Sequence, residues 1–131
     1  MPDKHIYEYA VIRLVPRVER EEFINIGVIV FCKRKGYLGM RYQLDEQRIA
    51  LFSEDLDLQH LHSYLQTWEL IAAGDPQGGD IAGREQAFRF RWLTAPRSTI
   101  IQSSRIHVGR CVEPEQVLEN LFGKYVLPPI A

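Results

Sequence analysis

The sequence predicts an α+β fold in which an antiparallel sheet, built on an N-terminal meander of strands, packs against about three helices. Two observations predict it: strand-like apolar runs dominate the first third of the chain, and apolar residues at helical spacing follow in three later segments. The length of 131 residues is typical of one domain. We therefore expect residues 1–131 to form a single globular domain.

Three strands are predicted in the first third of the chain. Residues 6–15 are mostly apolar on both faces, which is typical of a central strand covered on each side, and Pro16 ends the strand because proline has no amide hydrogen to donate. Residues 26–32 form the second predicted strand. A polar turn that contains Gly36 leads into the third, at residues 37–43.

Three helices are predicted from caps and spacing. Asp45 can cap a short helix that runs through residue 52. A longer helix is expected at residues 57–73, ended by Gly74. The last helix has Pro114 in its first turn. Its inner face is expected to consist of the apolar residues Val117, Leu118, Leu121, Phe122 and Tyr125.

The region between the long helix and the last helix is less regular. Residues 74–80 are rich in glycine and proline and predict an exposed loop. Phe88, Phe90 and Trp92 alternate with arginines, which predicts a half-buried strand, with a helix as the alternative. Residues 99–102 and 105–109 are expected to be extended.

Composition narrows the class of protein. Hydrophobic residues make up 46% and charged residues 25% of the chain, the balance of an ordinary globular protein. The N-terminus lacks the order of a secretory signal, and no apolar run approaches the roughly 18 residues that a membrane span needs. We therefore expect a cytoplasmic protein that does not enter the membrane.

Metal and cofactor chemistry is not predicted. Neither Cys32 nor Cys111 sits in a Cys-x-x-Cys pair, and free cysteine usually behaves as a small buried hydrophobe, so both are expected to be reduced packing residues. His60 and His62 would point about 200° apart on a helix and could not share a metal. Because the common phosphate-loop, dinucleotide, zinc-protease and serine-hydrolase signatures are also absent, we assign no catalytic residue, metal or cofactor.

The net charge of −1 conceals two blocks of opposite sign. Residues 44–80 hold eight carboxylates and one arginine, whereas residues 84–110 hold six arginines and one glutamate. The basic block is suited to binding an anion. Alternatively, the two blocks pair with each other across the surface.

One stretch of the basic block has the groups of an anion site. Around Pro96, the chain brings together hydroxyls, an amide and guanidinium groups, which hold phosphate or carboxylate by directed hydrogen bonds. The candidate ligand-binding residues there are Arg97, Ser98, Thr99 and Gln102. The alternative is a structural turn in which the hydroxyls bond the backbone and Arg97 forms a salt bridge to the acidic block.

Arg13 and Asn25 are two further candidate ligand-binding residues. Arg13 lies on an apolar face and needs a partner if it is buried; Glu22 or Asp45 can supply one, and so can an acidic ligand. Asn25 can cap or bridge the same region. Gly27 would let another chain or a ligand approach the backbone. A purely structural role for Arg13, Asn25 and Gly27 is the alternative.

Residues 7–16, 22–31 and 92–99 together resemble a bacterial family of unknown function, domain of unknown function family 3037. The resemblance implies a bacterial, single-domain protein and brings no established activity. Some members of this family are encoded beside HipA-like kinases, so the resemblance also implies an accessory or partner role. The motif positions that carry over, without roles, are Arg13, Asn25, Gly27, Arg97, Ser98 and Thr99.

Three hypotheses of function follow. The first is a non-catalytic protein-binding or regulatory module whose Arg97-centred surface meets an acidic partner or a HipA-like kinase. The second is an enzyme or sensor that clamps a small phosphate-bearing ligand between Arg13 and Arg97, with Ser98, Thr99 and Gln102 as orienting groups. The third, nucleic-acid binding by arginines among Phe88, Phe90 and Trp92, is disfavoured because the chain is not strongly basic. The oligomeric state stays open.

Overall fold

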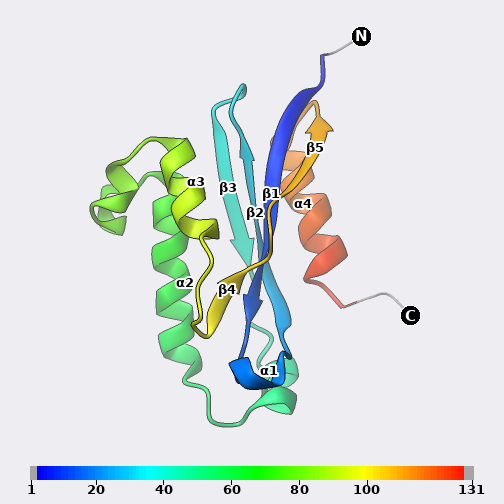
Figure 1. Ribbon diagram of the computed structural model, residues 1–131, viewed down its shortest axis with the longest axis vertical. Helices are drawn as coiled ribbons and strands as arrows, with labels where there is room; N and C mark the ends of the chain where they lie inside the picture. The colour runs from blue at the N-terminus through cyan, green and yellow to red at the C-terminus, as the bar shows by residue number, and fades with distance from the viewer. Residues whose placement is uncertain (1–2, 129–131) are drawn as a thin grey trace.

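The computed structural model describes residues 3–128, and within them an antiparallel sheet of five strands is flanked by four α-helices (Figure 1). The predicted α+β class and the N-terminal meander are confirmed, with four helices in place of about three. In chain order the elements are β1 (His5–Leu14), η1 (Val18–Arg20), β2 (Ile24–Cys32), β3 (Tyr37–Tyr42), α1 (Glu46–Phe52), α2 (Leu58–Ala73), η2 (Pro76–Gly78), η3 (Ile81–Gly83), α3 (Gln86–Thr94), β4 (Ile101–Ser103), β5 (His107–Cys111) and α4 (Pro114–Tyr125).

Strand β1 is the centre of the sheet. On one side it pairs with β2, which in turn pairs with β3. On its other side β1 pairs first with β5, from His5 to Tyr9, and then with β4, from Ile12 to Leu14. The central position that the two apolar faces predicted for this strand is therefore confirmed.

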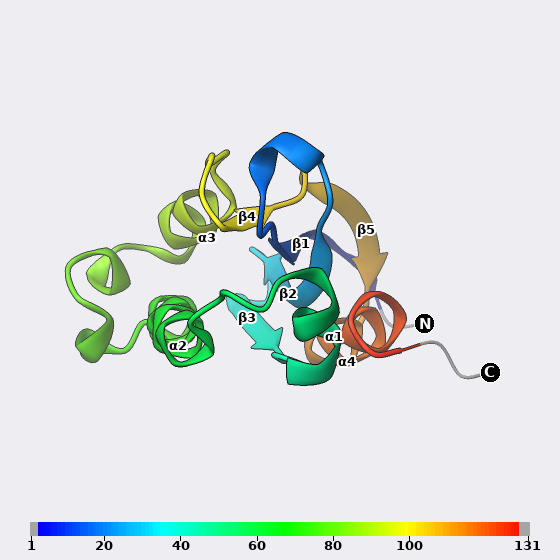
Figure 2. The same cartoon turned by 90° about the horizontal axis from the view of Figure 1, so that it is seen from below.

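The two faces of the sheet pack against different helices, as Figure 2 shows from below. Helices α2 and α3 cover one face, where Ile12 and Leu14 of β1 pack with Trp68 and Phe90. Helix α4 covers part of the other face, where Phe122 packs on Val28 and Val30. Each fully buried side chain of this size stabilises the fold by about 1.5–3 kcal/mol.

The predicted helix boundaries are confirmed at the caps. The Asp45 carboxylate accepts hydrogen bonds from the first amides of α1, and the Asp57 carboxylate accepts one from His60 in α2. Gly74 ends α2 with φ of 73°, in the left-handed region that glycine tolerates. Pro114 occupies the first turn of α4.

The prediction of a strand at residues 88–92 is wrong, because this segment forms helix α3. Phe90, Leu93 and Thr94 are buried at helical spacing, whereas Phe88 is exposed. Arg89, which alternation placed on the solvent side, is buried, and it donates to the backbone carbonyls of Arg84 and Ala72. The misleading pattern arose because a buried arginine with backbone acceptors looks polar in the sequence.

In the part of the chain that the structure describes, none of the helices has the length and apolar character that a bilayer crossing requires.

Replacing Gly27 by alanine should destabilise the protein, because the new Cβ would lie 2.9 Å from the carbonyl oxygen of Arg41 in β3. The close approach that Gly27 permits is thus made by a neighbouring strand. Chemical denaturation of Gly27→Ala should show a loss of about 1–3 kcal/mol in the free energy of unfolding. Gly123→Ala is the matched control: it lies in α4 with open space around it, so it should gain about 0.5–1 kcal/mol. A neutral Gly27→Ala would contradict this packing.

Candidate functional site

The half-buried Arg97 side chain donates hydrogen bonds to carbonyl groups at the C-terminal end of α3. Its Nη1 donates to the carbonyl oxygens of Leu93 at 3.0 Å and Ala95 at 3.4 Å, and its Nη2 donates to the carbonyl oxygen of Trp92. The guanidinium lies over the rings of Trp92, at 4.6 Å, and Trp68, at 5.0 Å. Burial lowers the pKa of Arg97. These contacts hold the guanidinium against the last turn of α3.

The other candidates of this stretch lie in the turn between α3 and β4. Ser98 and Thr99 are exposed. The Thr99 hydroxyl donates to the carbonyl oxygen of Ile101 at 2.8 Å, and Gln102 Nε2 donates to the carbonyl oxygen of Thr99 at 2.8 Å. The turn is therefore closed by its own side chains, as the structural alternative anticipated for the hydroxyl of Thr99. The salt bridge anticipated for Arg97 does not occur among residues 3–128.

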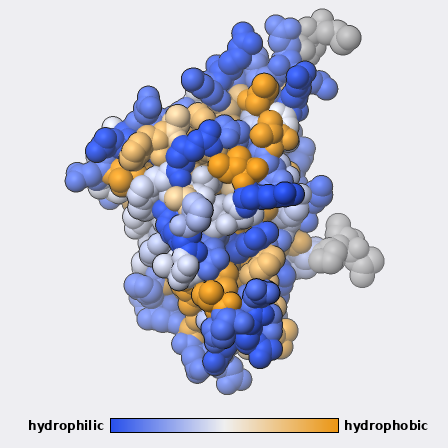
Figure 3. Space-filling view, viewed as in Figure 1, coloured by the Kyte–Doolittle hydropathy of each residue, from blue (hydrophilic) through white to orange (hydrophobic). Residues whose placement is uncertain are grey.

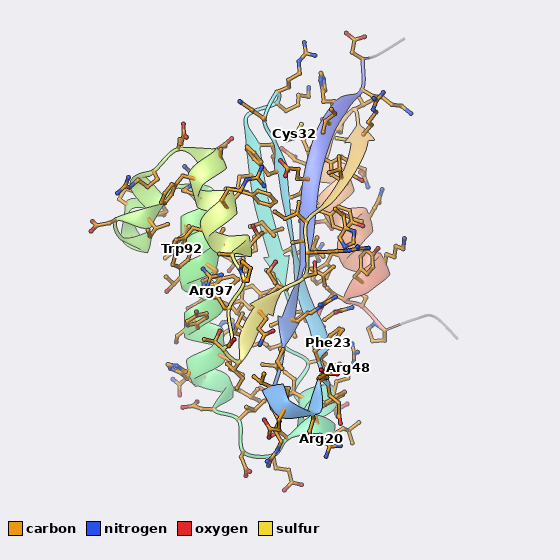
Figure 4. The ribbon with its side chains drawn as sticks, in the orientation of Figure 1. Arg20, Phe23, Cys32, Arg48, Trp92 and Arg97 are labelled. Carbon is orange, nitrogen blue, oxygen red and sulfur yellow. The ribbon has the colours of Figure 1, made fainter. Side chains whose placement is uncertain are left out.

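Arg13 lies on the opposite face of the sheet from Arg97. Its neighbours Ile12 and Leu14 point into the core under α2 and α3, so the Arg13 side chain projects toward the α4 face. Arg97 instead contacts Trp68 of α2 and Trp92 of α3 (Figure 4). The two arginines do not converge, and no single ligand of small size can meet both.

The register places three of the candidate residues in one row across the sheet. Arg13 of β1 is opposite Asn25 of β2 on one side and opposite Gln102 of β4 on the other. The pairing between β1 and β2 is irregular between Ile12 and Arg13. The extra residue, Ile26, lies in β2, and the alternation of β1 stays regular. The structure thus brings Arg13, Asn25 and Gln102 together and leaves Arg97 and Ser98 apart from them.

The Arg13 guanidinium is stacked on an aromatic ring and has no carboxylate partner among the described residues. It lies 4.2 Å from the ring centre of Phe23. Of the two partners anticipated for it, Glu22 pairs with Arg20 at 2.6 Å and Asp45 caps α1. Asn25 Nδ2 donates to the carbonyl oxygen of Tyr125 at the end of α4, at 3.1 Å. Arg13 Nε and Asn25 Oδ1 are buried and lack a hydrogen-bond partner within residues 3–128.

A second feature, at the end of the molecule where η1 and α1 lie, escaped the sequence analysis (Figure 1). We call this the lower end. Four large apolar side chains are exposed there, which we call the lower-end apolar patch: Val18 at 49%, Phe23 at 43%, Leu51 at 87% and Phe52 at 44%. Figure 3 shows apolar surface among charged side chains in this region.

A cleft of about 610 Å³ lies between the two segments that carry the patch. Figure 2 shows η1 and α1 on different sides of the lower ends of β1 and β2. The residues that line the cleft are Pro16, Arg17, Glu19, Arg20, Glu22, Leu51 and Phe52. The available sequence signal was the apolar run from Ile49 to Phe52, whose side chains point to several sides of a short helix. The structure buries only Ile49 of α1, which leaves Leu51 and Phe52 outside the core.

The lower end is acidic. The segments 16–23 and 45–57 hold eight carboxylates and three arginines. The carboxylates are Glu19, Glu21, Glu22, Asp45, Glu46, Glu54, Asp55 and Asp57. The exposed apolar side chains of the patch therefore lie in segments that are predominantly negative.

Metal ligands and cysteines were the remaining candidates for chemistry in the described chain. Residues 3–128 contain no group of three or more histidine, cysteine or carboxylate side chains placed to hold a metal ion. Cys32 and Cys111 are both free and buried, and they were predicted to be reduced packing residues.

The fold and these surfaces define an α+β protein whose antiparallel sheet lies between helices, with a polar row of Arg13, Asn25 and Gln102 on one face and exposed apolar residues at one end. The chain belongs to the family described as "Protein of unknown function (DUF3037)", whose model matches residues 9–126. The resemblance found in the sequence is thereby confirmed. No curated protein and no solved structure matches the chain.

Removing the Arg97 guanidinium should destabilise the protein, because three carbonyl groups at the end of α3 lose their donor and two indole rings lose their stacking partner. Arg97→Met should lower the free energy of unfolding by about 1–3 kcal/mol in a denaturant titration. Arg110→Met, which alters an exposed arginine of β5, should leave it nearly unchanged. Equal stabilities of the two variants would show that Arg97 does not hold this helix.

Proposed function

We propose that the chain is a non-catalytic protein-binding module and that its partner docks on the lower-end apolar patch. The observation that carries the proposal is the exposure of four large apolar side chains at the lower end, two of which, Leu51 and Phe52, line one cleft. Leu51 is the extreme case, since almost its whole side chain faces solvent. Protein interfaces commonly combine an apolar centre with a polar border, which is the arrangement at this end.

The charge around the patch indicates the chemistry of the partner. Because eight carboxylates and three arginines surround the apolar side chains, a partner with an apolar anchor and a basic border is complementary. An acidic partner at an Arg97-centred surface has weaker support, because the Arg97 Nη groups donate to backbone carbonyls of α3 and its turn. We therefore place the docking surface at the lower end.

The groups that line the cleft support binding over catalysis. Among the described lining residues there is no serine, threonine, cysteine or histidine to act as nucleophile, and the carboxylates are Glu19 and Glu22. The Arg20 and Glu22 side chains in the cleft pair with each other. These features favour a regulatory or accessory role in which the surface recognises another protein.

A HipA-like kinase is the partner that the family resemblance favours, and a bacterial cytoplasm is the location we propose for this interaction. Nucleic-acid binding has weaker support, because Phe90 is fully buried and Trp92 packs against Trp68 and Arg97, which leaves Phe88 as the exposed ring of the three. A base cannot stack on a ring that the core encloses.

Leu51→Asp should abolish partner binding without unfolding the protein, because the side chain is exposed and a charge there disrupts an apolar contact. The measurement is purification of the tagged chain from its native host at native abundance, followed by mass spectrometry of the proteins that elute with it. We expect one stoichiometric partner with the unmodified chain and at least about tenfold less of it with Leu51→Asp.

Val108→Asp is the matched control, since Val108 is an exposed apolar residue on β5, at the other end of the sheet. It should retain the partner, and thermal unfolding should verify that both variants fold. Recovery of the unmodified chain alone, as a monomer, would refute the proposal. Equal loss of the partner in both variants would place the interface elsewhere.

A further inference from the structure

Arg13 differs from the other arginines that are shielded from solvent. Among residues 3–128, four arginines are buried or half-buried. Three of them donate to backbone carbonyls: Arg48 to Val126, Arg89 to Ala72 and Arg84, and Arg97 to the end of α3. Arg13 alone of the four has neither a hydrogen-bond acceptor nor a carboxylate partner in this part of the chain.

A half-buried guanidinium without an acceptor is an unusual arrangement. Shielding the charge from water is unfavourable unless hydrogen bonds or an opposite charge replace the lost hydration. The ring of Phe23 offsets only part of this, because a cation over an aromatic ring contributes about 0.5–1 kcal/mol at an exposed site. Because the Nε atom is buried, the Nη groups at the outer end of the guanidinium are the donors that can bind an acceptor in the guanidinium plane.

The surroundings hold Arg13 in place. On one side, Asn25 donates a hydrogen bond to the carbonyl oxygen of Tyr125 at the end of α4. On the other side, Gln102 donates one to the carbonyl oxygen of Thr99. Strand β1 alternates regularly here, with Ile12 and Leu14 in the core, so the Arg13 side chain projects from the opposite face. Arg13 is therefore positioned by its neighbours, yet its charge is left without a counter-ion.

We propose that Arg13 binds the carboxylate or phosphate group of a small anionic ligand on the α4 face of the sheet. The free edge of the guanidinium matches the two oxygens of such a group in a bidentate hydrogen-bonded pair. Phe23 holds the guanidinium plane, and Asn25 and Gln102 flank the site. The lining of the lower-end cleft includes neither Arg13 nor Phe23, although Phe23 also belongs to the lower-end apolar patch, so the site borders that patch.

Heteronuclear NMR of the arginine side-chain Nε–Hε groups tests the proposal directly. Inorganic phosphate and succinate are titrated separately into the full chain at constant ionic strength, so that a phosphate site and a carboxylate site are distinguished. We expect a saturable shift of the Arg13 signal with a Kd of about 1 mM or lower for at least one probe. The backbone amides of Asn25 and Gln102 should shift with it, whereas Arg105, an exposed arginine, should not respond.

Two variants complete the test. Arg13→Lys keeps the charge but loses the planar fork, so binding should weaken by about tenfold, the loss of one charge-assisted hydrogen bond. Arg13→Gln should abolish saturation. If Arg13→Gln does not fold, the unmodified chain and Arg13→Lys decide the matter. Shifts of Arg13 that are linear and equal to those of Arg105, for both probes, would overturn the proposal and leave Arg13 as a solvated residue stacked on Phe23.

Discussion

The pairing of β1 along both of its edges is the constraint on which the rest of this structure depends. With β2 on one side and β5 followed by β4 on the other, the backbone of β1 is held along its whole length. Successive side chains must then point to opposite faces, so Ile12 and Leu14 enter the core under α2 and α3 while Arg13 points away from it. The separation of Arg13 from Arg97 follows from this alternation.

Several arginines stabilise the C-terminal ends of helices. The last carbonyl groups of a helix lack partners within it and carry the negative end of its dipole. Arg89 reaches the carbonyl oxygen of Ala72 near the end of α2, Arg97 reaches those at the end of α3, and Arg48 reaches that of Val126 just after α4. A chain that looks rich in free positive charge therefore uses much of that charge to hold its own helices. Arg13 is left as the shielded arginine that no such carbonyl meets within residues 3–128.

The negative charge and the apolar surface at the lower end come from two segments that are separated in the sequence. The acidic block between residues 44 and 80 contributes only part of the negative charge at the lower end, and the loop between β1 and β2 contributes the rest. The same two segments carry Phe23 and Leu51, so apolar surface and negative charge occur together. Membership of a family of unknown function assigns no activity to this surface. Its physical character, an apolar centre within an acidic border, is the argument for a binding role.

The sequence by itself determined the strands of the meander, the helices α1, α2 and α4, the cap at Asp45, the end at Gly74 and the first turn at Pro114, because these depend on periodicity and hydrogen bonds within a few residues. It also identified Arg13, Asn25 and Gln102 as residues of interest, but without showing that they form one row. Only the tertiary structure decided that residues 86–94 are helical and that Leu51 and Phe52 lie outside the core. It also decided that the Arg97 guanidinium donates hydrogen bonds to the carbonyl groups at the end of α3. The reason is that burial and pairing are set by neighbours distant in the chain, and local patterns of polar and apolar residues do not specify those neighbours.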